Sequence, residues 1–441
     1  DRVVLPPITP VARTLSLPLS FLQERLWFVH QHMEEQRTSY NGTIGLRIRG
    51  PLSVSGLRSA FEHLQARHES LRTVFKELPG GAGAVQIPQV DQELDFSVAD
   101  ATESAIAPAM DQLATHVYDL ANGPVLLVRV LKFTAEDHAL LIGMHHIVYD
   151  GWSQYNVMSR ELRAFYLAKV TGRTPQLSPL PIQYADYAVW QRAQDFRHHA
   201  RYWQEELEDY EDDLQLPYDY ARPPNRAWKA AGVTYDYPES LARAFGRFGR
   251  AHHTTLFMGL LTSFALVLKQ YTGKADLCIG TTTAGRTQLE LESIIGFFIN
   301  VLPLRIDLSG DPDMGELMRR TKRTVLGAFE YQALPFERIL SLVNTSRDSS
   351  KIPLVPVMLR HQNFPDATSE SLSDDLTMAV IERDERTTPN ELDLQFFGDE
   401  TYLRVHVEYP QELFSEATIR RLIHHHQRAV EFMVSTLNEA P

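Results

Sequence analysis

The clearest pattern of apolar positions predicts a buried strand that ends at two histidines. Residues 139–143 (Ala-Leu-Leu-Ile-Gly) are apolar without interruption, and Met144, His145 and His146 follow them directly. A short apolar run of this kind is typical of a strand that is covered on both faces. Because successive strand side chains point to opposite faces, we expect one of His145 and His146 to pack inside and the other to face open space.

The residues after the histidines predict the end of the strand and the start of a helix. Asp150 and Gly151 break the strand pattern, and Ser153 is placed to cap the helix that follows. Apolar residues between positions 157 and 166 supply the buried face of that helix. Gly151 gives the turn either a positive φ or room for a substrate backbone to approach closely.

Helical and strand patterns alternate along the rest of the chain and predict an α/β fold. Ser20 and Gln23 have the spacing of a capping box at a helix N-terminus. Further helices are predicted at 55–67, 184–190, 200–207, 254–271, 314–333 and 415–437, and further strands at 45–49, 125–133, 276–281, 354–359 and 402–408. The helix at 254–271 is apolar nearly all round, so we expect it to be buried.

The length of the chain predicts two lobes. A chain of 441 residues is too long for one ordinary core and suits two lobes of about 200 residues each. Residues 171–181 hold three prolines and few apolar residues, which predicts a hinge. The expected organisation is a linker over 1–16, an N-terminal lobe over 17–175 and a C-terminal lobe over 176–441. The first residues lack the features of a signal peptide and are interpreted as a linker cut from a longer chain.

Composition and charge narrow the function classes. Hydrophobic residues make up 44% of the chain, which supports large cores and argues against disorder. The formal net charge of −13, with no basic stripe to offset it, argues against nucleic acid as the main ligand. No apolar run approaches the length of a membrane span. Cys278 is the single cysteine, which excludes an internal disulfide and fits a reducing cytoplasm.

The strand end is also the best candidate for chemistry. A histidine at this position, His146, with Asp150 four residues on, is suited to proton transfer. A zinc site would need His145, His146 and Asp150 on a shared face, and strand alternation opposes this, so no metal is expected. The run His424–His425–His426 on the last predicted helix is interpreted as a solvated or packed helix face.

Seven short blocks occur in order along nearly the whole chain. They are Ser20 to Phe28, Arg67 to Phe75, Met144 to Ser153, Tyr184 to Trp190, Ile295 to Arg305, Tyr331 to Glu337, and Arg347 through Leu354. Together they resemble the condensation domains of nonribosomal peptide synthetases. A lone His-His-x-x-x-Asp-Gly pattern would be a weak signal, whereas seven ordered blocks argue strongly against chance agreement.

The resemblance implies two chloramphenicol-acetyltransferase-like lobes that form a V-shaped pseudodimer with a central tunnel. Two carrier proteins would dock at opposite mouths, each sending in a phosphopantetheine arm. One arm carries a donor acyl or peptidyl thioester, the other an acceptor aminoacyl thioester, and the domain joins them through an amide bond. The adenylation domain of the same module is a further expected partner. The domain itself is expected to bind no cofactor.

The resemblance also implies roles for named residues. His146 would accept the proton of the acceptor amine or orient that amine, which suits a neutral imidazole with a pKa of about 6.5. Asp150 would form a structural ion pair with Arg286 that ties the lobes. The N–H of Gly151 would help polarise the thioester carbonyl, and Arg67 would support the centre electrostatically.

The remaining candidates line the site or contact the substrate. His145 is expected to pack beside the centre, and the candidates for tunnel or substrate contact are Tyr149, Trp152, Ser153 and Asn300. Tyr149 stands where many members of the family carry a small residue. A phenol at that position would narrow the tunnel or place a hydroxyl near the thioester.

Other functions fit the same sequence. A condensation-like domain could use the same histidine to remove an α-proton and eliminate water from a Ser- or Thr-type acyl chain. Epimerization is less favoured, because Gly151–Trp152–Ser153 follows the condensation pattern. A non-catalytic docking platform would usually have lost the histidine or the aspartate of the motif, and both are present.

Overall fold

The chain divides into two compact units that are interleaved along the sequence. The computed structural model describes residues 6–14, 16–81, 83–223, 229–343, 353–362, 371–381, 386–388 and 390–438. Unit 1 comprises Asp1–Asp195, Ala284–Ile299 and Phe364–Arg383, and unit 2 comprises Phe196–Thr283, Asn300–Asn363 and Asp384–Pro441. This division differs from the predicted single boundary after residue 175. Proline-rich composition marks a loop, whereas membership of a unit depends on contacts between distant segments.

Unit 1 is built around a five-stranded sheet with the order β12-β2-β7-β6-β5. Its strands are β2 (Asn41–Arg49), β5 (Asp95–Asp100), β6 (Leu126–Thr134), β7 (Asp137–His145) and β12 (Thr377–Val380). β7 lies between β2 and β6 and pairs antiparallel with both. Residues 138–145 are all buried, so both faces of β7 are covered, as its continuous apolar run predicts.

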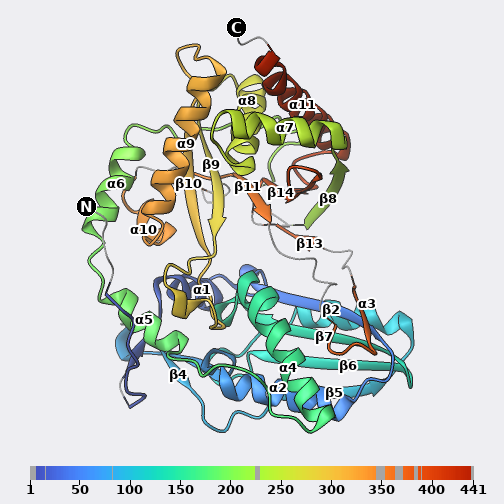
Figure 1. Ribbon diagram of the computed structural model, residues 1–441. Helices are drawn as coiled ribbons and strands as arrows, with labels where there is room; N and C mark the ends of the chain where they lie inside the picture. The colour runs from blue at the N-terminus through green and yellow to red at the C-terminus, as the bar shows by residue number, and fades with distance from the viewer. Residues whose placement is uncertain are drawn as a thin grey trace. The chain divides into compact units, whose positions relative to one another are not determined.

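Helices complete the core of unit 1. They are α1 (Phe21–His32), α2 (Val54–Arg67), α3 (Ile106–Ala114), α4 (Ser159–Thr171) and α5 (Tyr184–Arg192). Figure 1 shows α2 and α4 side by side, and buried Phe61 and Tyr166 from these helices join the core formed by the strands. A small sheet with the order β1-β4-β3 is formed by Leu17–Pro18, Ala84–Pro88 and Thr73–Glu77.

The predicted capping box at the start of α1 is confirmed. The hydroxyl of Ser20 accepts a hydrogen bond from the Gln23 amide at 3.1 Å, and the Gln23 side chain accepts one from the Ser20 amide at 3.1 Å. Both residues are buried. The two reciprocal bonds satisfy amide donors that have no partner within the helix.

Unit 2 contains a seven-stranded sheet with the order β10-β9-β11-β14-β15-β8-β13. The strands are β8 (Lys229–Asp236), β9 (Asp276–Thr283), β10 (Asn300–Asp307), β11 (Val357–Gln362), β13 (Arg386–Thr387), β14 (Leu392–Gly398) and β15 (Leu403–Pro410). The helices are α6 (Arg197–Glu206), α7 (Glu239–Ala251), α8 (Leu256–Thr272), α9 (Met314–Glu330), α10 (Phe336–Leu340) and α11 (Glu416–Ser435). Each unit therefore mixes helices with a sheet, and the predicted α/β class is confirmed.

Two helices of unit 2 show what local pattern can and cannot predict. Ten of the 17 residues of α8 are buried, which confirms its predicted burial. The helix α7 was not among the predicted helices, although buried Ala242, Phe245 and Phe248 recur along it at helical spacing. A Cβ at Gly246 would lie 2.7 Å from Cβ of Glu400, so this glycine permits a close approach that the sequence pattern does not reveal.

Among the described residues, no single helix is both long and apolar enough to cross a bilayer. The helices α7 and α8 meet the length and composition criteria only as a pair, with a bend of 104° between them.

Candidate active site

The two histidines lie where β7 ends. The strand stops at His145, and residues 146–148 form a 3₁₀ turn. His145 is fully buried and accepts a hydrogen bond from the Ile147 amide on Nδ1 at 3.1 Å. The predicted packing of His145 is confirmed. The two side chains separate because the chain leaves the strand at this point, and not through alternation along a regular strand.

His146 is only partly buried and has one ring nitrogen bound to the backbone. Its Nδ1 lies 3.4 Å from the carbonyl oxygen of Tyr149, which can only accept. Nδ1 therefore carries the proton, and Nε2 presents a lone pair. Desolvation lowers the pKa of His146 below its ordinary value of 6.5. The imidazole is therefore neutral at pH 7 and can accept a proton.

Asp150 caps the helical segment that follows the turn. Its Oδ1 accepts a hydrogen bond from the Ser153 amide at 2.8 Å, and its carbonyl accepts one from Gln154 at 3.0 Å. The prediction that Ser153 caps this helix is therefore wrong, since the capping carboxylate lies three residues earlier. The buried Ser153 hydroxyl lies 2.8 Å from Oδ1 of Asp150 and 2.9 Å from the Gly296 carbonyl oxygen. Ser153 was a candidate for substrate contact, but its hydroxyl is hydrogen-bonded to these protein groups.

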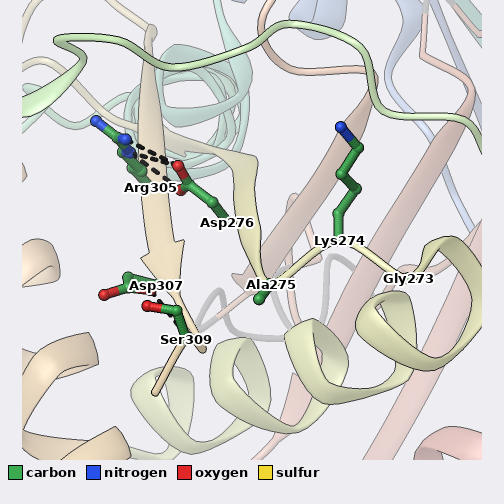
Figure 2. A pocket seen from close by; sticks show the side chains of 7 residues that line it. All are labelled: Gly273, Lys274, Ala275, Asp276, Arg305, Asp307 and Ser309. Atoms are coloured by element: carbon green, nitrogen blue, oxygen red, sulfur yellow. Dashed lines mark hydrogen bonds and ion pairs between the residues drawn. The ribbon is translucent and has the colours of Figure 1, made fainter. Parts of the chain in front are cut away.

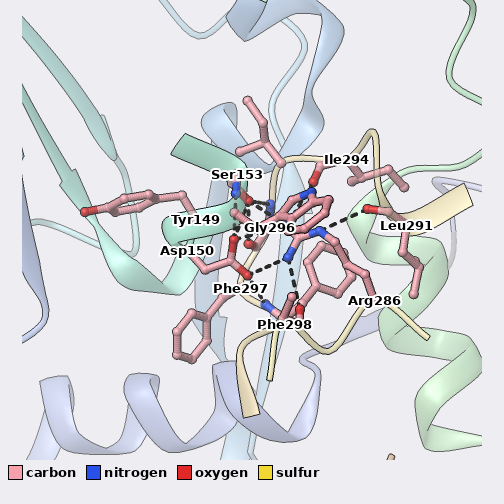
Figure 3. Close-up of polar contacts among 12 residues, drawn as sticks. Tyr149, Asp150, Ser153, Arg286, Leu291, Ile294, Gly296, Phe297 and Phe298 are labelled. Carbon is pink, nitrogen blue, oxygen red and sulfur yellow. Dashed lines mark hydrogen bonds and ion pairs between the residues drawn. The ribbon is translucent and has the colours of Figure 1, made fainter. Parts of the chain in front are cut away.

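The predicted ion pair between Asp150 and Arg286 is present and buried. Nη1 and Nη2 of Arg286 lie 2.9 Å and 3.1 Å from the two carboxylate oxygens, and each side chain is 2% exposed. The Phe298 amide donates to Oδ2 at 2.9 Å. Figure 3 shows these donors converging on the carboxylate. The pair does not tie two lobes, because the segment Ala284–Ile299 that carries Arg286 belongs to unit 1.

Arg286 also organises the loop from which it projects. Its guanidinium donates to the carbonyl oxygens of Leu291 at 3.2 Å and Ile294 at 3.3 Å, and lies 4.4 Å from the centroid of the Phe298 ring. Asp150 in turn accepts from Ser153, Arg286 and Phe298. These contacts suit a structural role for the pair, because the carboxylate oxygens are directed at protein donors.

A second buried charge cluster was only partly anticipated. Nε of Arg67 lies 3.1 Å from both carboxylate oxygens of Glu161, and Nε2 of His68 lies 2.7 Å from Oε2. Nδ1 of His68 accepts from the Ile295 amide at 3.3 Å. Arg67 thus supports the loop Ala284–Ile299 through Glu161 and His68. Glu161 is fully buried on α4, and its acidic residue type gave no sign of burial in the sequence.

The remaining candidates divide into open and occupied positions. A Cβ at Gly151 would meet no atom within 4 Å, and its φ is not in the left-handed region, so room for close approach is the interpretation that remains. The Trp152 indole donates to the Glu292 carbonyl at 3.0 Å and is partly exposed. Asn300 lies in unit 2, where its buried amide donates to Gln332 and Leu334 carbonyls and accepts from Phe336. Its side chain serves the fold there, although it was a candidate for substrate contact.

Unit 2 carries a separate surface pocket of about 510 Å³. It is lined by Gly273, Lys274, Ala275, Asp276, Arg305, Asp307 and Ser309. Figure 2 shows Arg305 paired with Asp276 on one side and Lys274 extending away from them. Lys274 pairs with Asp213 at 2.6 Å. The charges in this pocket are therefore balanced by protein groups.

No group of three or more histidine, cysteine or acidic side chains gathers in a metal-binding arrangement in the part of the chain that the structure describes. His145, His146 and Asp150 have the protein partners given above. Of the seven sequence blocks, residues 347–352 lie outside the described residues.

Comparison with known proteins identifies the family. The condensation domain family matches residues 15–440. Malpinin synthetase of Mortierella alpina is 36% identical over 421 residues, which cover 94% of this chain and 5% of that protein. Chondramide synthase of Chondromyces crocatus is 33% identical over 440 residues, which cover 97% of this chain and 11% of that protein. The chain thus spans a small part of the length of these curated relatives.

Solved structures agree over nearly the full chain. The X-domain from teicoplanin biosynthesis, also solved in complex with OxyB, has a TM-score of 0.87 and 26% identity, over 98% of this chain and 97% of that chain. The epimerization domain from the third module of tyrocidine synthetase B has a TM-score of 0.74 and 20% identity, over 98% of each chain, which shows a shared fold. The chain belongs to the condensation domain family of nonribosomal peptide synthetases.

Proposed function

We propose that this domain forms an amide bond between a donor acyl or peptidyl thioester and an acceptor aminoacyl thioester. The observation that carries the proposal is the state of His146. Its Nδ1 is directed at a backbone carbonyl, its Nε2 is left with a lone pair, and desolvation lowers its pKa. A neutral imidazole of this kind can take the proton that the acceptor amine loses as it attacks the donor carbonyl.

The groups around His146 support this assignment of roles. Asp150 and Arg286 hold the turn and the loop next to it, and neither acts as a catalytic acid in the proposal. Gly151 follows Asp150 and is open on its Cα side, where a thioester can approach the backbone. Its N–H would then polarise the donor carbonyl as that oxygen gains negative charge.

The substrates and partners are part of the proposal. Donor and acceptor would arrive on phosphopantetheine arms of two carrier proteins, and an adenylation domain of the same module would load the acceptor. The passage between the lobes that the family resemblance implies stays a prediction. Action in a reducing cytoplasm fits the single cysteine, Cys278, which is buried and free.

Mass spectrometry of loaded carrier proteins tests the reaction. With matched donor and acceptor carriers, the wild-type chain is expected to give an intermolecular amide on the acceptor. His146→Ala is expected to lower the rate by about 10²–10⁴-fold, the usual contribution of a general base. Residual activity is expected, because holding two tethered reactants in line accelerates the reaction by itself.

The same assay separates the rival functions. His424→Ala, which changes an exposed histidine of unit 2, is the matched control and should keep full activity. Loss of water from one carrier-bound acyl group would identify a dehydrating domain. Inversion at the α-carbon leaves the mass unchanged in ordinary water, so an epimerizing domain would be identified by uptake of solvent deuterium at the α-carbon when the assay is run in D2O. Full activity of His146→Ala would refute the proposed base.

A docking function is the second candidate, and one observation favours it. The X-domain, the structural relative with a TM-score of 0.87, is solved in complex with OxyB. A chain of the same fold can therefore serve as a binding partner for another protein. The neutral, partly exposed His146 favours catalysis over this alternative. Unchanged carriers in the mass assay would favour docking.

A further inference from the structure

Tyr149 contacts the imidazole of His146 in two ways. The two rings are nearly parallel, with centroids 4.6 Å apart and planes 6° apart. The backbone carbonyl of Tyr149 also receives the Nδ1–H bond of His146 at 3.4 Å. One residue therefore covers a face of the ring and directs one of its nitrogens. The Tyr149 side chain is itself held firmly, since the residue is only 3% exposed.

The phenol of Tyr149 occupies space that Gly42 leaves empty. Gly42 lies on β2 opposite Met144 of β7. A Cβ at Gly42 would lie 1.3 Å from the Tyr149 hydroxyl oxygen and 2.6 Å from Cζ. The φ of Gly42 is not in the left-handed region, so alanine could adopt the backbone conformation. The position therefore requires glycine because of Tyr149, and not because of strand geometry.

We propose that Gly42 and Tyr149 form a positioning pair that sets the orientation of His146. The gap at Gly42 lets the phenol lie flat against the imidazole, and this contact keeps Nε2 directed toward the reacting amine. The inference rests on the proposed function in one respect, namely that Nε2 of His146 accepts the proton of the acceptor amine. Tyr149 is a positioning residue here and exchanges no proton.

The surroundings of His146 explain why a ring contact has a measurable effect. Desolvation lowers the pKa of His146, whereas the hydrogen bond to the Tyr149 carbonyl and the charge of Asp150 raise it by smaller amounts. The Phe297 ring, whose centroid lies 6.2 Å from that of the His146 ring, covers another part of the imidazole. The neighbouring titratable residue in the chain is His145. Burial raises the pKa of the Tyr149 hydroxyl, so that group stays protonated. Removing the Tyr149 ring would admit water to one face of the imidazole.

Four variants separate the ring, the hydroxyl and the gap. Tyr149→Phe keeps the ring, Tyr149→Ser removes it, and Gly42→Ala fills the gap. The double variant Gly42→Ala with Tyr149→Ser fills the gap when no phenol is present. Gly45→Ala, on the same strand, is the matched control, because its Cβ would meet the side chains of Met110 at 3.0 Å and Ile381 at 3.1 Å instead of Tyr149.

The first measurement is the pKa and tautomer of His146 by NMR of labelled histidine, with the signal identified from its loss in His146→Gln. We expect Tyr149→Phe and Gly45→Ala to leave both unchanged. Tyr149→Ser and Gly42→Ala should each raise the pKa of His146 toward 6.5, because the ring gains water. In a chain that already carries Tyr149→Ser, Gly42→Ala should cause no further change in the pKa of His146.

The second measurement is the rate of amide formation with loaded carriers. Loss of one aromatic contact should lower kcat by roughly two- to tenfold. Thermal unfolding of each variant identifies any general loss of folding. An equal effect of Gly42→Ala with and without the phenol would overturn the proposal, as would an unchanged His146 pKa in Tyr149→Ser. The two proposals can also fail separately. If the His146 pKa shifts in Tyr149→Ser but the wild-type chain forms no amide, the positioning pair is supported and the proposed reaction is refuted.

Discussion

Asp150 and Arg286 form a buried ion pair although 136 positions separate them in the chain. Two hydrogen bonds of 2.9 Å and 3.1 Å join the guanidinium to the carboxylate, and both side chains are 2% exposed. The pair holds the segment Ala284–Ile299 against the end of β7. The candidate active site of unit 1 is thus assembled from two distant parts of the sequence.

Arg286→Met should destabilise the chain, because it leaves the Asp150 carboxylate buried without its counter-ion. Removing one partner of a buried pair costs about 3–5 kcal/mol. Urea denaturation measures the loss. The double variant Asp150→Asn with Arg286→Met should recover part of it, since the amide is neutral and still accepts from the Ser153 amide. If the losses in free energy of unfolding of Asp150→Asn and Arg286→Met simply add up in the double variant, a direct pairing is contradicted.

His68→Phe should loosen the loop that carries Arg286. The change removes the acceptor of the Ile295 amide, which lies 3.3 Å from Nδ1 of His68. A buried amide left without a partner costs about 1–3 kcal/mol, so hydrogen exchange in this loop should accelerate by roughly tenfold or more. Exchange mass spectrometry of peptides covering 284–299 measures this. His63→Phe changes an exposed histidine on α2 and is the control. Equal exchange rates of the 284–299 peptides in both variants would contradict the prediction.

Stability should fall between pH 7 and pH 5, in part because of His426. This buried histidine lies 2.7 Å from the Tyr237 hydroxyl and 2.8 Å from the Ser263 hydroxyl, and burial lowers its pKa to about 3. The unfolded chain, with an ordinary histidine pKa of 6.5, binds the proton more readily, so stability is present above that value and is lost on acidification. At pH 5, His426 accounts for roughly 2 kcal/mol of the stability lost relative to neutral pH.

Urea denaturation at several pH values checks this contribution. His426→Gln should show a shallower loss of stability between pH 7 and pH 5 than the wild type. His424→Gln changes an exposed histidine of the same helix, α11, and is the control. The same pH dependence in His426→Gln and in wild type would show that this histidine contributes nothing to acid sensitivity.

The pH dependence of kcat should show one acidic limb from His146. Desolvation lowers the pKa of this imidazole, so the active neutral form persists below its ordinary value of 6.5. We expect kcat to be flat above that value and to fall with an apparent pKa below it. Single-turnover amide formation at saturating carrier concentrations gives the profile. A limb that persists in His146→Ala would belong to another group.

Several features of the fold and site could be predicted from the sequence because their causes are local. The apolar run at 139–143 predicted β7, and the spacing of Ser20 and Gln23 predicted the capping box of α1. The pairing of Asp150 with Arg286 has no local cause, because 136 positions separate the two residues. The family resemblance implied it, and the geometry confirms it. The helix cap was misplaced at Ser153, because the sequence offers both serine and aspartate as caps and only their hydrogen bonds distinguish them.

The sequence by itself determined the two mixed α/β halves, the buried strand that ends at His145 and the family to which the motifs belong. These depend on residue type and short-range spacing, which the chain carries in its order. Only the tertiary structure decided that Ala284–Ile299 belongs to unit 1, that Glu161 is a buried partner of Arg67 and that Tyr149 fills the gap at Gly42. Such contacts depend on which distant surfaces exclude water together, and short-range spacing does not encode that choice.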